Sequence, residues 1–320
     1  MVMQFFNPNP ELDRYRGALL GLAAGDALGA PVEFMRPGSF EPVTEMMGGG
    51  PHGLMPGEWT DDTSMALCLA ESLIECRGFD AVDQLQRYVR WWQYGHLSST
   101  GLCFDIGFTT RDALEGFQAT GLPSGLTSPD SAGNGSIMRL APVPMFYALN
   151  MHDAVEFAGQ SSATTHAAEE AVNACRFMSA VIVRALLGSS KEDVLAPPVA
   201  DDLSDGIRRV AYGSFRIFSP PQIRGSGFVV ESLEAALWAF HNSDNFADGA
   251  TLAVSLGEDT DTTAAVYGQI AGAYYGASRI PRDWVNALAR RDMIIDFADQ
   301  LYDLRPLSYP GEWGTSEPAS

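Results

Sequence analysis

The stretch Tyr15-Arg-Gly-Ala-Leu-Leu-Gly-Leu-Ala-Ala-Gly-Asp-Ala-Leu-Gly29 carries glycine at every fourth position. A second stretch, Gly268-Gln-Ile-Ala-Gly-Ala-Tyr-Tyr-Gly276, repeats the pattern near the other end of the chain. Glycine inside a helix costs roughly 1 kcal/mol relative to alanine, so such a stripe needs a compensating contact. We therefore expect both stretches to form central helices of a soluble bundle, packed backbone against backbone as neighbours.

Apolar residues recur at three- and four-residue intervals along most of the chain, which is typical of amphipathic helices. The pattern predicts helices at Tyr15–Leu28, Ser64–Cys76, Val82–Tyr94, Ala167–Leu187, Glu231–Phe240, Ala247–Leu256, Thr262–Ala277 and Arg282–Arg290. Strand patterns are nearly absent, and only short runs such as Gly227–Val230 are able to pair. The sequence therefore predicts an all-α fold in which helices pack on one another.

No linker or shift in composition divides the 320 residues. We expect a single compact multi-helix domain over residues 10–310, with terminal extensions at 1–9 and 311–320. The formal charge of −20, with Lys191 as the only lysine, argues against binding to nucleic acid or to an anionic membrane. The chain shows no signal peptide and no apolar run of membrane length, so we expect a cytoplasmic protein.

Two short acidic clusters, Thr60-Asp-Asp-Thr63 and Asp259-Thr-Asp-Thr-Thr263, stand directly before helix-forming runs. Mg²⁺ and Mn²⁺ prefer six oxygen ligands, commonly carboxylates, hydroxyls and water. The clusters offer such oxygens from Thr60, Asp61, Asp62, Asp259, Asp261 and Thr262. We expect two ions that share a bridging carboxylate, and we expect the free N–H groups at the helix starts to keep the aspartates ionised.

Helix capping is the alternative interpretation of these clusters. Asp and Thr are favoured N-cap residues, so Asp61 and Asp259 would serve as caps without binding any metal. Capping requires one acid for each helix, however, and the two clusters hold four aspartates. This excess favours the metal site.

Several other segments carry candidate site residues. The run Gly133-Asn-Gly-Ser-Ile-Met-Arg139 has the composition of a phosphate-binding loop, and equally that of a plain turn. His166 either meets a phosphate or ribose hydroxyl or is a surface residue at a helix start. Glu33 is a base, a metal ligand or a surface charge. Asp105 lies in an apolar stretch, where an unpaired carboxylate would be costly, which favours a place in the site.

The glycine-rich segment Gly48–Gly53 formally matches a dinucleotide-binding pattern. Pro51 interrupts it, however, and no strand–helix unit surrounds it. We interpret this segment as a flexible loop that covers the site.

In chain order, these motifs resemble those of the ADP-ribosylglycohydrolase family, whose members include the dinitrogenase reductase activating glycohydrolase and the ADP-ribosylarginine and ADP-ribosylserine hydrolases. The resemblance rests on Gly21-Leu-Ala-Ala-Gly-Asp-Ala-Leu-Gly29 with Glu33, Trp59-Thr-Asp-Asp-Thr-Ser-Met65, Phe104-Asp-Ile-Gly107, Gly133-Asn-Gly-Ser-Ile-Met-Arg139, Thr165-His166 and Gly257-Glu-Asp-Thr-Asp-Thr-Thr-Ala-Ala265. It runs from about Tyr15 to Trp284.

The resemblance implies a compact, monomeric all-α enzyme with two Mg²⁺ or Mn²⁺ ions at the base of a cleft that binds ADP-ribose. It implies metal ligation by the threonines and aspartates of the two acidic clusters. Glu33 matches a glutamate that contacts a metal or gates the site, and Asp105 matches a catalytic acid or base. The implied contacts with diphosphate and ribose are made by Gly133, Asn134, Gly135, Ser136, Met138 and His166.

The function implied is hydrolysis of the bond between ADP-ribose and its acceptor, which is an ADP-ribosylated protein or a small ADP-ribosyl conjugate. The Phe104–Gly107 motif favours the arginine-type branch, and the sequence does not choose between Asp105 and Glu33 as the proton carrier. Two rival functions are a non-catalytic ADP-ribose binder, which loss of a metal ligand would indicate, and a di-metal phosphohydrolase. A di-metal phosphohydrolase would have more Lys and Arg residues near its site than this chain contains.

Overall fold

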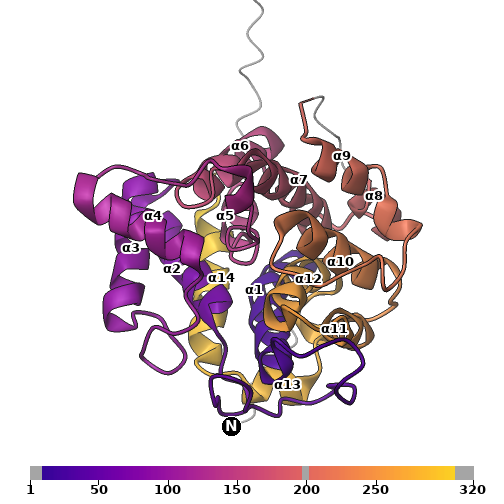
Figure 1. The fold of residues 1–320 in the computed structure, drawn as a ribbon. Coiled ribbons are helices and arrows are strands. Elements are labelled where there is room, and N and C mark those ends of the chain that lie inside the picture. Colours follow the sequence, from indigo (N-terminus) through magenta and orange to yellow (C-terminus); the bar gives the residue numbers. More distant parts are fainter. Residues whose placement is uncertain (1–8, 197–201, 307–320) are drawn as a thin grey trace, which may run out of the picture.

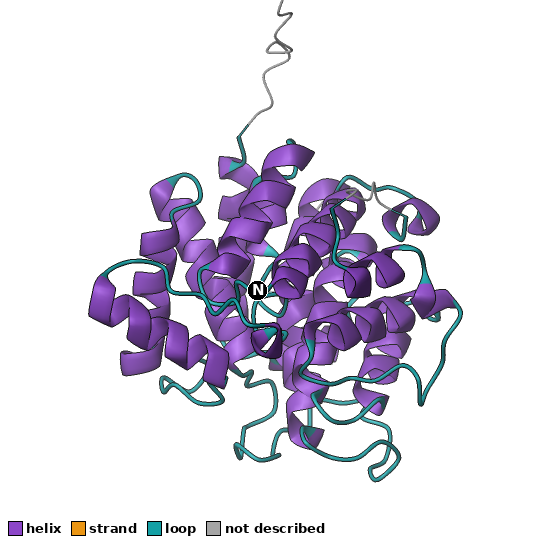
Figure 2. Cartoon of the chain, turned by 45° about the horizontal axis from the view of Figure 1, so that its top comes forward, coloured by secondary structure: helices purple, strands orange, loops and turns teal. Residues whose placement is uncertain are grey.

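The computed structural model describes residues 9–196 and 202–306, and within these ranges the chain is helical and forms no β-strand (Figure 2). The all-α prediction is confirmed. The helices are α1 (Pro10–Gly29), α2 (Asp61–Cys76), α3 (Ala81–Tyr94), α4 (Phe108–Thr120), α5 (Pro142–Phe146), α6 (Met151–Ala163), α7 (Glu169–Leu186), α8 (Lys191–Val194), α9 (Asp205–Ala211), α10 (Val229–His241), α11 (Phe246–Ser255), α12 (Thr260–Tyr275), α13 (Arg282–Ala287) and α14 (Arg291–Leu304).

Each predicted helix is present, and most begin and end within a few residues of the predicted bounds. The helix expected at Arg282–Arg290 ends earlier, at Ala287, because the next residue, Leu288, leaves helical geometry with φ of −56° and ψ of 126°. The periodicity did not identify α4, α6 and α14, nor the short helices α5, α8 and α9. The run Gly227–Val230 forms no strand, since Val229 and Val230 begin α10 and Phe228 makes only an isolated bridge with Gly133.

Helices α1 and α12 form the centre of the molecule and run antiparallel (Figure 1). A Cβ atom added to Gly21 would lie 2.3 Å from the carbonyl oxygen of Gly268, and one on Gly17 would lie 2.2 Å from that of Gly272. Only glycine permits this approach, so the predicted pairing of the two stripes is confirmed. The end of α1 therefore lies against the start of α12.

The other helices surround this pair. Helix α14 packs along α1, α7 and α10 pack along α12, and α2 lies with α3 and α4 on one side of the molecule (Figure 1). Among the described residues, none of the helices is both long and apolar enough to cross a lipid bilayer. Asn9 caps α1 through its side chain. The rest of the expected extensions lies outside the described residues, so the boundaries at 10 and 310 stay predictions.

Candidate active site

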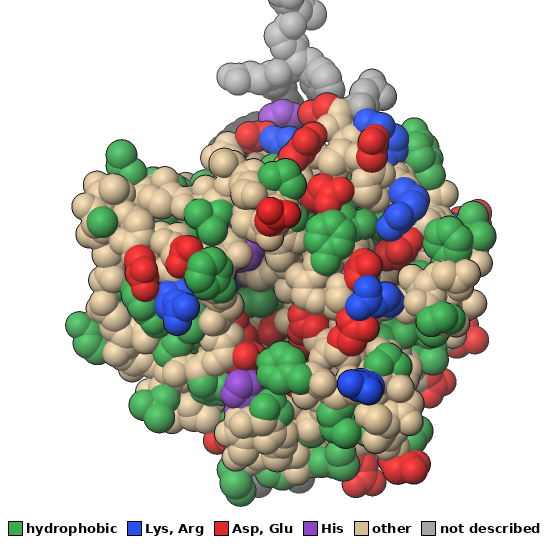
Figure 3. Space-filling view, in the orientation of Figure 1, with side chains coloured by type: hydrophobic (Ala, Val, Ile, Leu, Met, Phe, Trp, Pro, Cys, Tyr) green, Lys and Arg blue, Asp and Glu red, His purple; other side chains and the backbone are tan. Residues whose placement is uncertain are grey.

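The antiparallel packing of α1 and α12 brings the two acidic clusters together. Thr60 Oγ1, just before α2, lies 3.0 Å from Asp62 Oδ2 and 3.2 Å from Asp261 Oδ2, at the start of α12. Thr262 Oγ1 lies 3.4 Å from the same Asp62 oxygen. In the space-filling view, acidic side chains gather on the floor of a hollow in the middle of one face of the molecule (Figure 3).

Asp26, on α1 between two glycines of the stripe, is a central member of this cluster that the sequence interpretation missed. It is completely buried, and its Oδ1 accepts hydrogen bonds from the backbone N–H of Thr60 at 2.8 Å and from Thr60 Oγ1 at 3.0 Å. Its Oδ2 accepts from the backbone N–H and the hydroxyl of Thr63, at 3.1 and 2.6 Å. Asp26 thus caps α2 from a neighbouring helix. The available signal was a single acid within the glycine-striped, apolar part of this helix, Tyr15–Gly29.

The capping interpretation is wrong for Asp61, and Asp259 occupies the predicted N-cap position without making a side-chain capping hydrogen bond. The N-cap residue of α2 is Thr60 and that of α12 is Asp259, and neither makes a side-chain capping hydrogen bond. The aspartates of the clusters are therefore not engaged in closing their own helices. Since Asp26 closes α2, Asp61 and Asp62 are free for another purpose.

The donor set fits a hard divalent cation. Oxygens of Asp26, Asp62 and Asp261 all lie within 4.8 Å of one another, and all three residues are buried. Oδ1 of Asp62 and Oδ1 of Asp261 are buried without any hydrogen-bond partner among the described residues. Buried carboxylate oxygens without a donor are costly, and a cation is the partner that satisfies them.

The expectation that helix N-termini keep these aspartates ionised is wrong for the protein alone. Burial, reinforced by the neighbouring carboxylates, raises the pKa of Asp61, Asp62 and Asp261 well above the ordinary range. Burial also raises the pKa of Asp26 to about 6, although its four hydrogen bonds oppose the shift. Positive charge brought to the site would oppose these shifts and favour the ionised carboxylates.

Glu33 and Asp105 lie together at the edge of the cluster, and His52 joins them. His52 Nε2 lies 3.1 Å from Glu33 Oε2 and 3.4 Å from Asp105 Oδ1. Burial, and then the charge of Asp105, raises the pKa of Glu33 to about 9. Burial, with repulsion from Asp259 and Asp26, raises the pKa of Asp105 to about 7, against a hydrogen bond with Asp61. His52 comes from the Gly48–Gly53 loop, which the sequence analysis interpreted only as a loop that covers the site.

Backbone contacts fix the position of Glu33 near the second cluster. The N–H of Phe34 donates to the carbonyl of Glu258 at 2.7 Å, and the N–H of Glu258 donates to the carbonyl of Met35 at 2.8 Å. Phe34, Glu258 and Asp105 each have positive φ, of 64°, 63° and 59°. Strained backbone of this kind gathers at functional sites, where the surrounding structure holds it in place.

The Gly133–Arg139 segment lies beside the second cluster. Asn134 Nδ2 donates to Asp259 Oδ2 at 2.8 Å, which links the loop to that aspartate. The backbone N–H groups of Gly133, Gly135 and Ser136 donate to no other described residue. The side chains of Ser136 and Met138 are buried, and Ser136 Oγ accepts from Ser162 Oγ at 2.9 Å. The backbone of this loop is thus the part able to meet a ligand.

His166 is buried rather than a capped surface residue, since only 3% of it is exposed. Its ring lies directly beside the loop, because a Cβ added to Gly135 would lie 2.8 Å from its Cε1 and 2.9 Å from its Nε2. The structure therefore brings all of the predicted site residues to one region, and it adds Asp26 and His52 to them.

Comparisons with known proteins identify the family of this chain. The family model described as ADP-ribosylglycohydrolase matches residues 7–311. The chain is 46% identical to the ADP-ribosylarginine hydrolase Tri1 of Pseudomonas putida (strain GB-1), over 93% of this chain and 80% of the relative. It is 30% identical to the ADP-ribosyl-(dinitrogen reductase) glycohydrolase of Rhodospirillum rubrum, over 86% of this chain and 90% of that protein.

A solved structure, of an ADP-ribosylglycohydrolase-related protein complex, superposes with a TM-score of 0.83 at 46% identity and covers 92% of this chain and 99% of that one. The fold and the acidic cleft define an all-α enzyme with a candidate metal site. The chain belongs to the ADP-ribosylglycohydrolase family. The resemblance seen in the motifs is confirmed.

Proposed function

We propose that this protein is a divalent-metal-dependent hydrolase that cleaves the glycosidic bond between ADP-ribose and an arginine side chain of a modified protein, releasing ADP-ribose. One observation carries the proposal: buried carboxylates from separate helices converge with partnerless oxygens beside a loop of free backbone N–H groups. The name of the Pseudomonas relative supports arginine as the acceptor.

Thr60, Asp61, Asp62, Asp259, Asp261 and Thr262 are the residues that would hold two Mg²⁺ or Mn²⁺ ions. Asp26 supports them rather than binding directly, because both of its oxygens already accept two hydrogen bonds each. When bound, such ions supply the positive charge that holds ribose hydroxyls and offsets the negative charge of the site.

Glu33 and Asp105 are suited to carry the protons of the reaction. Burial raises the pKa of Glu33 to about 9 in the absence of a cation, which favours a carboxyl that gives its proton to the departing guanidine as the bond from the ribose C1″ to nitrogen breaks. Asp105, with a pKa of about 7, is poised to accept the proton of the attacking water. The bond breaks through an oxocarbenium-like state, as in glycoside hydrolysis generally.

A panel of conjugates tests this function. Purified protein with Mg²⁺ or Mn²⁺ is incubated with ADP-ribosyl-arginine peptide, ADP-ribosyl-serine peptide and O-acetyl-ADP-ribose, and the products are identified by mass. We expect intact ADP-ribose, released fastest from arginine. Release of AMP would indicate a phosphohydrolase instead, and binding without any product would indicate a non-catalytic relative.

A further inference from the structure

Arg139 is a buried cation that has no role in the proposed reaction. Only 1% of it is exposed, and it forms no ion pair with a carboxylate among the described residues. Its guanidinium lies over the ring of Tyr88, 4.5 Å from the centroid, and its Nη2 donates to Thr165 Oγ1 at 2.7 Å. Burying a guanidinium without an acidic partner is unfavourable, so its retention calls for a reason.

The Thr165 hydroxyl links Arg139 to His166, since Thr165 Oγ1 lies 2.8 Å from His166 Nδ1. A guanidinium has only donors, so the hydroxyl must accept from Arg139. Its single proton is then left for His166 Nδ1, because Oγ1 has no other acceptor within reach among the described residues. A neutral imidazole that accepts at Nδ1 carries its proton on Nε2.

The proton on His166 Nε2 is left available to a ligand. His166 Nε2 makes no hydrogen bond to any described residue and lies 3.7 Å from where a Cβ on Gly133 would be. The adjacent N–H groups of Gly133, Gly135 and Ser136 also lack acceptors within the described chain. The groups that gather here are all donors, which suits the acceptor-only oxygens of a phosphate better than a hydroxyl that must also donate.

We infer that Arg139 and Thr165 are positioning residues that lock His166 in the tautomer with its proton on Nε2, so that it donates to a phosphate oxygen of ADP-ribose. The phosphate contact rests on the proposed function, whereas the tautomer does not. The imidazole also stays uncharged, because burial and then the charge of Arg139 lower the pKa of His166 to about 3.

Nitrogen NMR of protein labelled with ¹⁵N-histidine tests the tautomer directly, and His166→Gln identifies its signal among the five histidines. We expect an unprotonated Nδ1 and a protonated Nε2 in the wild type. Thr165→Val, which removes only the hydroxyl, should convert the signal to a mixture with the Nδ1–H form, and Thr165→Ser should restore it. A wild-type Nδ1–H form, or a Thr165→Val signal like that of the wild type, would overturn the inference.

Thr164→Val is the matched control, because the hydroxyl of Thr164 bonds to Ser161 and Gln84 and not to His166. It should leave the tautomer as in the wild type, and a mixture in this variant too would count against a specific lock. If Arg139→Met folds, it should give the same mixture of tautomers as Thr165→Val. If it does not fold, the Thr165 variants alone test the tautomer.

Calorimetric titration with ADP-ribose tests the ligand half. Losing one hydrogen bond to a charged oxygen should weaken affinity by about tenfold or more in Thr165→Val, with recovery in Thr165→Ser. Suppose that the tautomer responds as expected and that the wild type binds ADP-ribose. If all variants then bind ADP-ribose with the same affinity as the wild type, the proposed phosphate contact is wrong. If the wild type does not bind ADP-ribose, the proposed function fails and the tautomer lock stands.

Discussion

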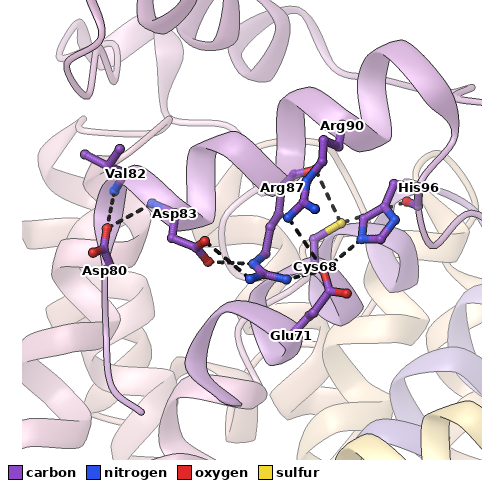
Figure 4. Close-up of polar contacts among 8 residues, drawn as sticks. All are labelled: Cys68, Glu71, Asp80, Val82, Asp83, Arg87, Arg90 and His96. Atoms are coloured by element: carbon purple, nitrogen blue, oxygen red, sulfur yellow. Dashed lines mark hydrogen bonds and ion pairs between the residues drawn. The ribbon is translucent and has the colours of Figure 1, made fainter. Parts of the chain in front are cut away.

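Helix α2 carries acidic side chains in two opposite settings. At its start, Asp61 and Asp62 face other carboxylates, and neither forms an ion pair with an arginine or lysine of the described chain. Farther along, Glu71 meets nitrogen donors from the next segments of the chain. It pairs with Arg87 of α3, and its Oε2 lies 2.7 Å from His96 Nε2 (Figure 4). Arg87 also pairs with Asp83.

The pKa values follow these surroundings. Burial alone would raise the pKa of Glu71, but hydrogen bonds from His96 and Arg87 outweigh it and lower the pKa below its ordinary value. At the start of the same helix, burial and neighbouring carboxylates act in one direction and raise the pKa values of Asp61 and Asp62. The protein thus pairs one acidic network with its own cations and leaves the other without a cationic partner among the described residues. We expect stability to depend on the first network and activity on the second.

Removal of metal should have the largest effect. Exhaustive chelation should abolish hydrolysis, because the carboxylates at the start of α2 and α12 have no internal cation. Asp261→Asn should lose bound metal, measured by elemental analysis, together with turnover. Asp205→Asn, the same change on an exposed acid of α9, is the control and should change neither. Full turnover after chelation would show that the acidic cluster at the start of α2 needs no cation for activity.

Substitution of the proton carriers should have the next largest effect. Asp105→Asn should lower kcat by roughly 10²–10⁴-fold and leave ADP-ribose affinity and metal content nearly unchanged, because its altered pKa suits proton transfer. Glu33→Gln is compared with it in steady-state and binding assays. If only Glu33→Gln shows this signature, Glu33 carries the essential proton alone. If both variants retain full activity, neither carboxyl is needed for proton transfer.

Breaking the internally paired network should reduce stability and spare activity. Arg87→Met leaves Glu71 and Asp83 without their shared cation, and loss of one partner from a buried pair costs about 3–5 kcal/mol. Because Glu71 is partly exposed, we expect the lower part of that range or less. Urea unfolding measures the loss, and kcat of the folded variant should equal that of the wild type. Arg208→Met, which breaks an exposed pair with Asp205, should cost far less.

Sequence predicted those parts of the molecule that depend on local pattern. The glycine stripes predicted which two helices meet, since only glycine allows backbones so close, and this meeting brings the acidic clusters together. Residues recruited across the fold were harder to find. Asp26 caps a helix that begins far along the chain, and His52 reaches Glu33 and Asp105 from a loop with no regular structure.

The charge state of the site was also beyond the sequence. The helix-start argument counted backbone N–H groups and predicted ionised aspartates, but burial is a property of the whole fold and outweighs them. Likewise, Ser136 appears in a polar, glycine-rich run, yet its hydroxyl faces the interior because Ser162 and Cys175 donate to it there.

The smallest expected effect is a change of stability with pH, and it distinguishes the two networks by sign. A carboxyl whose pKa is raised by folding contributes stability at low pH, and this contribution is lost as the pH rises through the pKa of the folded state. A carboxyl whose pKa is lowered by folding contributes stability that is lost as the pH falls through the pKa of the folded state. Between pH 7 and 8.5 the paired acids Glu71 and Asp83 are ionised in both states. Glu33, with a pKa of about 9, still holds its proton only in the folded state.

The free energy of unfolding of the chelated protein should therefore fall as the pH rises from 7 to 8.5, by up to about 1.4 kcal/mol per pH unit for each proton involved. Urea unfolding at pH 7.0, 7.75 and 8.5 measures this slope. Glu33→Gln should reduce it, since Asp61, Asp62 and Asp261 also have raised pKa values, whereas Arg87→Met, although less stable throughout, should keep it. Saturating Mg²⁺ should also reduce the slope, because a cation near these carboxyls favours their ionised forms at every pH. A free energy of unfolding that rises with pH would show that the uncompensated cluster does not govern stability in this range. A slope that is the same in Glu33→Gln as in the wild type would show that Glu33 does not contribute to it.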